Sequence, residues 1–527
     1  MANDEPDADT GGDLGGDDVE AAAGHFRLKA AALVGGPIAG LVVYLLLPDR
    51  VIGEAGTIVE LGHAGRATAA VAVVMAIWWM TEAIHVSATA LLPIALLPLL
   101  DASSVDDAAA PYANPLIFLF LGGFLIALGM RRWGLERRIA LRTLRLVGTE
   151  PRRVVGGFML LTALLSMWVS NTATVAMLLP IALSVIDAAV PDGRDALLSD
   201  EYVPGQRFAR SLLLGIAASA SIGGVATLIG TPPNLFLASF ARDDLGTEIS
   251  FVRWMAVGLP IAAVFLPVAW VLLTRVLFRP DVERSAIASL VDDRALSDLG
   301  PVQRGEKVVL VVFVTTAMAW MFRPLLVDLS IAGATPLAGL TDAGIAVLAG
   351  VALFVIPVDR TGTRALDWTT ARQLPWGVLL LFGGGLSLAA ALAANGVTDY
   401  LGVQVEGLDV HPIVLIGIVT AGVVFLTEIT SNTATAAALI PIVSAVAPGL
   451  GLHPLALAIP VALSASLAFM LPVATPPNAI VFASGFVGMP ALMRFGLRLN
   501  IASIVIVTTA VPLLALPVLG IDLRSGG

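Results

Sequence analysis

The sequence predicts an all-α polytopic membrane protein, and three observations point to this fold class. Of its 527 residues, 57% are hydrophobic and 13% are charged, whereas soluble globular domains carry about 25% charged residues. Apolar runs of helical-span length recur along the whole chain. The alternating pattern of membrane β-strands is absent from these runs. Together these features exclude a soluble fold and indicate a single membrane domain.

Composition also excludes several functional classes. The chain has no cysteine, which rules out disulfide scaffolds and thiolate metal sites. Its five histidines show no metal-ligand spacing, and no HExxH motif occurs. Much of the net charge of −10 comes from residues 1–24, which we expect to form a disordered acidic tail without the features of a signal peptide. We expect no nucleic-acid partner.

The apolar segments in chain order are 29–48, 67–84, 86–101, 113–130, 154–190, 208–240, 251–278, 308–327, 342–357, 375–394, 411–448, 455–490 and 495–519. Most have the length of one helical span and are rich in Leu, Ala, Val and Ile. The string TPPN interrupts segments 208–240 and 455–490. Because tandem prolines remove backbone donors and stop a helix, we expect two broken helices there.

Segments 154–190 and 411–448 are too long for one span and too short for two, and the string SNTAT interrupts both. Each half has about 15 residues and a length of about 22 Å, which is less than the hydrocarbon core of about 30 Å. We therefore predict two re-entrant helical hairpins. The other segments then form about 11 transmembrane helices.

The basic residues predict the orientation in the membrane. With the N-terminus in the cytoplasm, most of the 30 lysine and arginine residues lie on the cytoplasmic side, as the positive-inside rule requires. The first hairpin then opens toward the cytoplasm and the second toward the outside. The arginine run between residues 131 and 145 is interpreted as an interfacial amphipathic helix on the cytoplasmic face. We expect a multi-pass protein of the plasma membrane.

Internal repetition divides the chain into two halves, 25–280 and 281–527. Three motifs occur once in each half: Gly-Gly at 122–123 and 383–384, SNTAT at 170–174 and 431–435, and TPPN at 231–234 and 475–478. Because the two hairpins open to opposite sides, the repeats are inverted, which is a recurring plan of secondary transporters. The paired glycines indicate close packing of helices.

The SNTAT and TPPN motifs have the chemistry of an anion-binding site. Ser, Asn and Thr begin helices, but one such residue is enough for that, and here the same five residues occur twice. Their side chains and free backbone N–H groups can bind an anion. A proline kink explains the prolines of TPPN but not its Thr and Asn. Since segments 154–190, 211–241, 411–448 and 455–490 contain no Lys or Arg, helix N-termini and bound sodium must balance a dianion.

These motifs, together with the stretch ASLAFMLPVATPPNAIV (465–481), resemble the divalent anion:sodium symporter family over residues 29–519. The resemblance implies an elevator-type transporter, in which hairpins and broken helices slide against a scaffold that also forms a homodimer. It implies sodium-coupled uptake of a C4-dicarboxylate such as succinate or malate, or of sulfate in some branches. Exchanger branches carry basic groups where sodium would sit, and none occurs here.

The resemblance also implies the residues of the binding sites. The first sodium site would use Ser166, Ser170, Asn171 and the carbonyl group of Gly230. The second would use Thr427, Thr430, Asn432 and the carbonyl group of Ala474. The substrate would contact Ser170, Asn171, Thr172, Ser431, Asn432, Thr433, Thr475 and Pro476.

Two other functions compete with symport. A sodium/proton antiporter of the same superfamily should carry titratable acids at the breaks, and only Glu428 lies near them. A membrane enzyme would need a nucleophile with a base or a metal cluster, and since neither is visible we expect no enzymatic activity. Glu428 itself can either orient the second hairpin turn or contact an ion directly.

Overall fold

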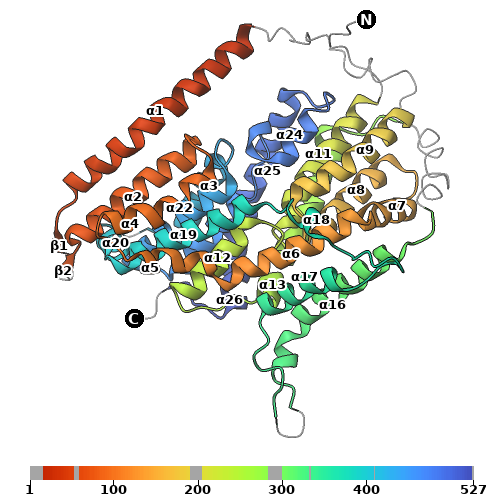
Figure 1. Ribbon diagram of the computed structural model, residues 1–527. Coiled ribbons are helices and arrows are strands. Elements are labelled where there is room, and N and C mark those ends of the chain that lie inside the picture. The colour runs from red at the N-terminus through yellow and green to blue at the C-terminus, as the bar shows by residue number, and fades with distance from the viewer. Residues whose placement is uncertain are drawn as a thin grey trace, which may run out of the picture.

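The computed structural model describes residues 16–52, 58–189, 205–282, 300–330, 334–408 and 410–524. Within these ranges the chain is mostly helical (Figure 1), and its single sheet pairs β1 (Arg50–Ile52) with β2 (Ile58–Glu60) in antiparallel register. The all-α fold class is thus confirmed. Seven helices of the described ranges are long and apolar enough to cross a membrane. The count of about 11 spans and the re-entrance of the hairpins stay predictions.

The first half of the chain builds a series of helices. They are α1 (Gly16–Leu46), α2 (Gly62–Thr81), α3 (Val86–Thr89), α4 (Leu92–Leu99), α5 (Val105–Ala109), η1 (Ala110–Ala113), α6 (Pro115–Arg132), α7 (Leu135–Val147), α8 (Pro151–Ser166), α9 (Asn171–Ala189), α11 (Gln206–Gly224), α12 (Pro232–Asp243), α13 (Phe251–Val271) and the π-helical η2 (Leu272–Leu277).

The second half follows the same order of long, paired and broken helices. Its elements are α16 (Arg304–Val327), α17 (Asp342–Val355), α18 (Trp368–Ala371), α19 (Trp376–Ala394), α20 (Val397–Val403), α21 (Pro412–Leu426), α22 (Asn432–Val446), η3 (Pro448–Leu450), α23 (Pro454–Ala465), η4 (Pro472–Ala474), α24 (Pro476–Phe482), α25 (Met489–Ala510), η5 (Val511–Ala515) and α26 (Leu516–Leu519).

Helix α1 begins inside the range expected to be a disordered tail. Its first residue is Gly16, whereas the tail was assigned to 1–24; residues 1–15 lie outside the described ranges. Acidic residues favour a helix N-terminus because they offset its partial positive charge, and the sequence places Asp17, Asp18 and Glu20 at this point.

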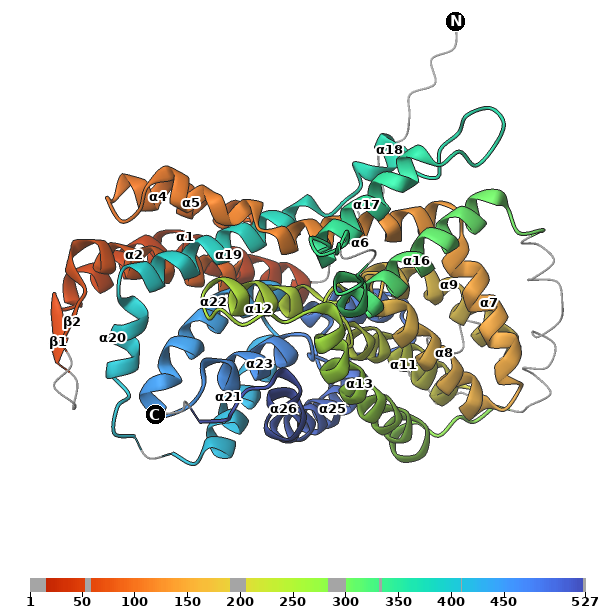
Figure 2. The same cartoon turned by 90° about the horizontal axis from the view of Figure 1, so that it is seen from below.

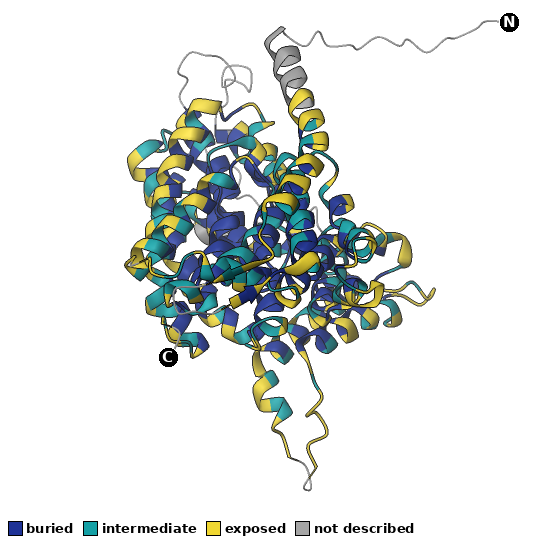
Figure 3. Ribbon diagram, turned by 90° about the vertical axis from the view of Figure 1, so that its left-hand side faces the viewer, coloured by how far each residue is buried: buried dark blue, intermediate teal, exposed yellow. Residues whose placement is uncertain are grey.

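Burial separates an outer layer of helices from a central pair. Figure 3 shows buried residues concentrated in the interior, with exposed ones along α1 and the outer helices. Large apolar side chains of α1, such as Leu41 and Leu45, are exposed, as a lipid-facing helix requires. In contrast, α11 is buried except for Arg207 and Arg210, and α23 is buried except for its first residue. Both central helices end at a break.

The Gly-Gly motifs lie at close helix contacts, as the sequence predicted. A Cβ atom at Gly122 of α6 would lie 2.4 Å from the backbone carbonyl oxygen of Ala346 in α17. At Gly384 of α19, it would lie 2.2 Å from the carbonyl oxygen of Ala90. Since no real Cβ approaches another heavy atom so closely, only glycine permits these two crossings.

One residue of the arginine run 131–145 is buried in the protein, and the interfacial position of the run stays a prediction. Arg138 is 6% exposed and forms an ion pair with the buried Glu306 of α16. Its Nη2 atom donates to Glu306 Oε1 at 3.0 Å, and its Nη1 atom donates to the Gly300 carbonyl at 3.1 Å. The partner lies far along the chain, so the pattern of α7 alone could not reveal this contact. The pair ties α7 to the start of α16.

Candidate functional site

The two SNTAT motifs form turns between paired helices. Ser170 closes the turn between α8 and α9, and its Oγ atom accepts a hydrogen bond from the Ala173 backbone N–H at 3.3 Å. Ser431 occupies the same place before α22, but its side chain makes no capping hydrogen bond. Starting a helix therefore accounts for the serine of the first motif only. The hydroxyl of Ser431 does not cap its helix.

A hydroxyl group contacts the motif asparagine in both turns. Ser166 Oγ lies 2.5 Å from Asn171 Oδ1 and 2.7 Å from the carbonyl oxygen of Ala220. The second turn repeats this arrangement around Thr427, whose Oγ1 lies 2.7 Å from Asn432 Oδ1 and 3.1 Å from the Ala465 carbonyl oxygen. Each hydroxyl has one hydrogen and faces two acceptor oxygens. Such groups of oxygen atoms suit a hard monovalent cation.

The first predicted sodium site is brought together around Gly224, where α11 ends. A Cβ atom at Gly224 would lie 2.7 Å from Asn171 Oδ1 and 3.1 Å from the carbonyl oxygen of Gly230. Ser166 contacts the Oδ1 atom of the same asparagine. Three of the four predicted ligands therefore converge, and the absence of a side chain at Gly224 leaves room between them. Ser170 lies in the adjoining turn.

The second predicted sodium site is assembled less completely. Thr427 and Asn432 are in contact, but Thr430 Oγ1 instead lies 2.7 Å from Thr435 Oγ1 and donates to the Leu426 carbonyl at 2.9 Å. Ala474 is the buried last residue of η4. Among the described contacts, no hydrogen bond joins Thr430 or Ala474 to Asn432.

The asparagine of each TPPN motif binds the carbonyl groups that the break releases. Asn234 Nδ2 donates to the carbonyl oxygens of Gly224 at 3.2 Å and Thr227 at 2.9 Å. In the second half, Asn478 Nδ2 donates to the corresponding carbonyls of Ala468 at 3.4 Å and Leu471 at 3.1 Å. Both asparagines are buried. Unpaired backbone carbonyls are costly at membrane depth, so these amides stabilise the unwound segments.

The remaining predicted substrate residues differ in exposure. Thr475 is buried, and its Oγ1 accepts from the Asn478 backbone N–H at 3.3 Å, which begins α24. Thr172 and Pro476 are exposed, and Thr433 is half-buried. The Ser and Asn residues of the two SNTAT motifs are also half-buried, namely Ser170, Asn171, Ser431 and Asn432. The motif side chains thus lie at an accessible surface rather than in the closed core.

The two breaks are joined directly. Thr231 Oγ1 of the first TPPN motif lies 3.0 Å from Ser466 Oγ, which follows α23, and both residues are buried. The halves also cross: α24 packs against α9 and α11, and α12 packs against α22 and α23. Figure 2 shows α12 close to α23, and α11 beside α8. Each hairpin therefore contacts the broken helix of the other half.

The Glu428 carboxylate contacts the backbone of the second break and the side chain of Asn500. Its two carboxylate oxygens accept hydrogen bonds from the successive backbone N–H groups of Phe469, Met470 and Leu471 at 2.8 to 3.0 Å. Asn500 Nδ2 donates to the same carboxylate at 2.7 Å. Of the two roles that the sequence left open, this geometry supports the structural one. The sequence placed Glu428 near the turn but could not identify partners 41 or more residues away.

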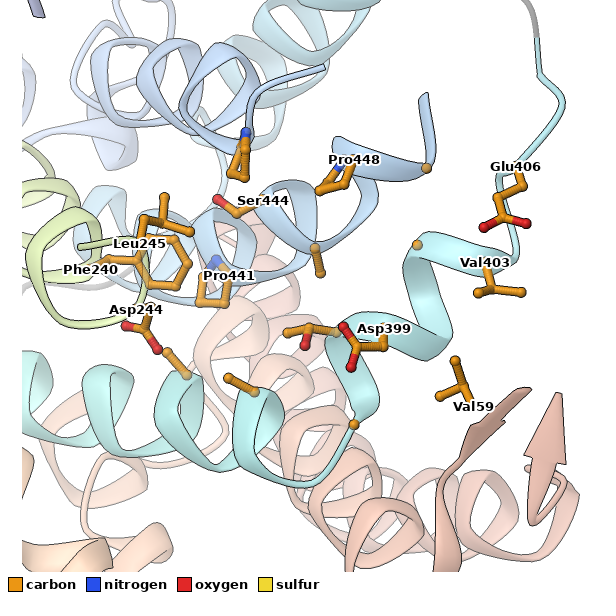
Figure 4. Close-up of a pocket in the computed structure, with 18 of the residues that line it drawn as sticks. Val59, Phe240, Asp244, Leu245, Asp399, Val403, Glu406, Pro441, Ser444 and Pro448 are labelled. Atoms are coloured by element: carbon orange, nitrogen blue, oxygen red, sulfur yellow. The ribbon is translucent and has the colours of Figure 1, made fainter. Parts of the chain in front are cut away.

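A separate cavity of about 670 Å³ lies outside this site (Figure 4). It opens between α19 and α20 on one side and α22 with the end of α12 on the other, and Asp244, Asp399 and Glu406 line it. No predicted ion or substrate residue contributes to it. Among the described residues, no group of three or more His, Asp or Glu side chains could hold a metal ion.

Comparisons with known proteins connect this geometry to transport. Residues 57–519 match the family described as "Sodium:sulfate symporter transmembrane region". The chain is 39% identical to the sodium-dependent dicarboxylate transporter SdcS of Staphylococcus saprophyticus, over 94% of this chain and 93% of that protein. It is 40% identical to SdcS of Staphylococcus aureus, over 86% of each chain. The YdaH transporter of Alcanivorax borkumensis has a similar fold, with a TM-score of 0.56, 15% identity, and coverage of 92% of this chain and 97% of that one.

Proposed function

The chain belongs to the sodium:sulfate symporter family, and from this membership we propose that it couples sodium entry to the uptake of a small divalent anion. The resemblance stated from SNTAT and TPPN is thereby confirmed, and the relatives are transporters rather than enzymes. A C4-dicarboxylate such as succinate or malate is the favoured substrate, because the relatives of high coverage are named dicarboxylate transporters. Sulfate is the second candidate, favoured by the description of the family.

One observation carries the proposal: at both hairpin turns a hydroxyl group and an asparagine meet a backbone carbonyl of α11 or α23. Ser166, Asn171 and the Ala220 carbonyl form the first group, and Thr427 and Asn432 with the Ala465 carbonyl form the second. These neutral oxygens suit sodium. No lysine or arginine occurs in residues 154–190 or 411–448, so a dianion would be held by the starts of α9, α22 and α24 and by the bound sodium.

A sodium/proton antiporter is less well supported. It needs a carboxyl group at the breaks that gains and loses a proton during transport. The one candidate, Glu428, accepts hydrogen bonds from three backbone N–H groups and from Asn500. These contacts give Glu428 a structural role, in which it keeps the break in place.

Coupling follows from the shared site. Sodium bound at the two asparagines orders the hairpin turns, and the ordered turns then complete the site for the dianion. Because both ligands favour the same state, each raises the affinity for the other. The loaded hairpins and broken helices move as an elevator against a scaffold that also forms a homodimer. The protein lies in the plasma membrane with its N-terminus on the cytoplasmic side, so the first hairpin opens toward the cytoplasm.

Uptake into proteoliposomes tests the function. An inward sodium gradient should drive the uptake of succinate, malate or sulfate, and a potassium gradient should not. Asn171→Ala and Asn432→Ala should each reduce this uptake to background, because each removes the side chain at the centre of one oxygen group. The exposed Gln373→Ala is the matched control, since it removes an amide far from the site and should transport normally.

Folding has to be followed in the same variants. Size-exclusion profiles and thermal unfolding in detergent should match those of the unmodified protein. Full sodium-driven transport by either asparagine variant would contradict the site. A lack of uptake of all three anions by the unmodified protein would contradict the proposed function.

A further inference from the structure

Four arginines surround a cavity at one end of three packed helices. The cavity, of about 590 Å³, lies where α11 begins, where η2 ends α13, and where α25 begins. Contacts of η2 with α11 and with α25 bring these ends together. The arginine pocket is defined by Arg207 and Arg210 of α11, Arg279 after η2 and Arg494 of α25. Among the residues that the structure describes, no acidic side chain lines it.

One of these arginines is poised for a ligand. The Nε atom of Arg210 is buried and has no hydrogen-bond partner. A buried donor without a partner is costly, and a guanidinium group more so than a neutral one. Asp281 lies close by, where it accepts a hydrogen bond from the Phe208 backbone N–H at 3.2 Å.

The chemistry of the arginine pocket matches a phosphate group. Guanidinium groups bind phosphate oxygens in bidentate fashion, and several of them around one cavity can contact a single phosphate from different sides. The start of α11, a helix of 19 residues, adds the partial positive charge of its N-terminus. A carboxylate would fill less of this volume and use fewer of the donors.

The surroundings indicate that the phosphate belongs to a lipid. Val276 lines the cavity and is 58% exposed, and Met493 and Leu497, on either side of Arg494, are each 41% exposed. Both α13 and α25 belong to helices apolar enough to span a membrane. Nearby, the Arg275 guanidinium lies 5.4 Å above the ring of Trp270, and tryptophans of this kind mark the headgroup level. Basic pockets between helices at this level bind anionic headgroups.

We propose that the arginine pocket binds the phosphate headgroup of an anionic phospholipid, with the acyl chains along the exposed apolar sides of η2 and α25. The lipid joins the ends of three helices that come from both halves of the chain. It therefore stabilises the folded protein. The proposal does not depend on which anion is transported.

Lipid binding to the full chain in detergent tests this site. Native mass spectrometry measures the bound lipid, and thermal unfolding measures the stability. Added phosphatidylglycerol should raise the unfolding temperature until the site is saturated, whereas phosphatidylcholine should not raise it. The double variant Arg279→Gln/Arg494→Gln should bind phosphatidylglycerol about 30-fold more weakly, because each arginine contributes about 1 kcal/mol at an anionic headgroup. Both side chains are exposed, so the fold should tolerate their loss.

Arg360→Gln/Arg372→Gln is the matched control, since both residues are exposed and belong to the same predicted membrane face. This variant should bind the lipid like the unmodified protein. If the first double variant does not fold, Arg494→Gln alone should weaken binding about fivefold. The proposal would be overturned if the control variant lost as much affinity for phosphatidylglycerol, or if phosphatidylcholine stabilised the protein equally. It would also be overturned if millimolar inorganic phosphate displaced all of the bound lipid.

Discussion

Glu136 is a buried carboxyl group in the first turn of α7. Its side chain is 3% exposed, and its Oε1 atom has no hydrogen-bond partner. Burial raises the pKa of Glu136 from 4.5 to about 7, although the nearby Arg131 lowers it. The folded state therefore binds this proton more tightly than the unfolded state does, and its contribution to stability is present at low pH and is lost as the pH rises through about 7.

Glu136→Gln should consequently stabilise the protein at pH 8 and have little effect at pH 5. Glutamine resembles the protonated carboxyl group, so the variant avoids a cost of about 3 kcal/mol that the ionised form carries. The measurement is the unfolding temperature in detergent as a function of pH. Glu82→Gln, which changes an exposed carboxylate, is the control and should follow the unmodified protein at both pH values. A stabilisation equal at both pH values would contradict the prediction.

At the scale of elements, the two breaks are the features on which the site depends. Gly224 ends α11 beside Asn171 and the Gly230 carbonyl. Gly224→Ala would place a methyl group among these oxygens. It should therefore raise the sodium concentration that gives half-maximal uptake by about tenfold or more. Sodium-dependent uptake and sodium-induced thermal stabilisation measure this.

The matched control for that substitution is Gly422→Ala. Gly422 lies within α21 of the other hairpin, and a Cβ atom there would meet no atom within 4 Å. The same chemical change should therefore leave the sodium dependence unaltered. If Gly224→Ala also kept the normal sodium dependence, sodium would not bind between Asn171 and Gly230.

The same elements show which contacts a sequence can reveal. Two copies of SNTAT and TPPN were enough to place the turns and breaks, because repetition of polar residues within apolar segments is visible along the chain. The roles of individual side chains were not visible. Asn234 holds carbonyls inside its own break, and Thr231 reaches Ser466 in the other half. Those assignments depend on how the helices cross, which is a property of the packed molecule.

For the whole molecule, the lack of cysteine makes the proposed movement testable. A Cβ atom at Gly402 of α20 would lie 3.2 Å from the carbonyl oxygen of Ala445 in α22, and both residues line the cavity of Figure 4. If the hairpins slide past α19 and α20, linking Gly402→Cys to Ala445→Cys with Hg²⁺ should stop uptake. Removal of Hg²⁺ by a thiol should restore it.

A second cysteine pair distinguishes sliding from general rigidity. A Cβ atom at Gly417 of α21 would lie 3.6 Å from Thr508 Cγ2 of α25, and these two helices pack together. Because α25 packs against both α21 of the second hairpin and α23 of the second broken helix, we expect it to move with them. Linking Gly417→Cys to Thr508→Cys should therefore leave uptake intact. Loss of uptake with both pairs, or with neither, would contradict an elevator movement at this boundary.

The two hairpin turns differ in one charged residue, and this difference bears on the order in which ligands arrive. Glu428 stands three residues before Ser431, whereas Met167 stands three residues before Ser170. The segment after α23 is therefore held by a carboxylate, and the segment after α11 only by neutral groups. A preorganised site loses less entropy on binding. We therefore expect the first sodium ion to bind at Asn432. Sodium should slow the hydrogen exchange of the backbone amides of residues 225–230 far more than that of residues 469–471.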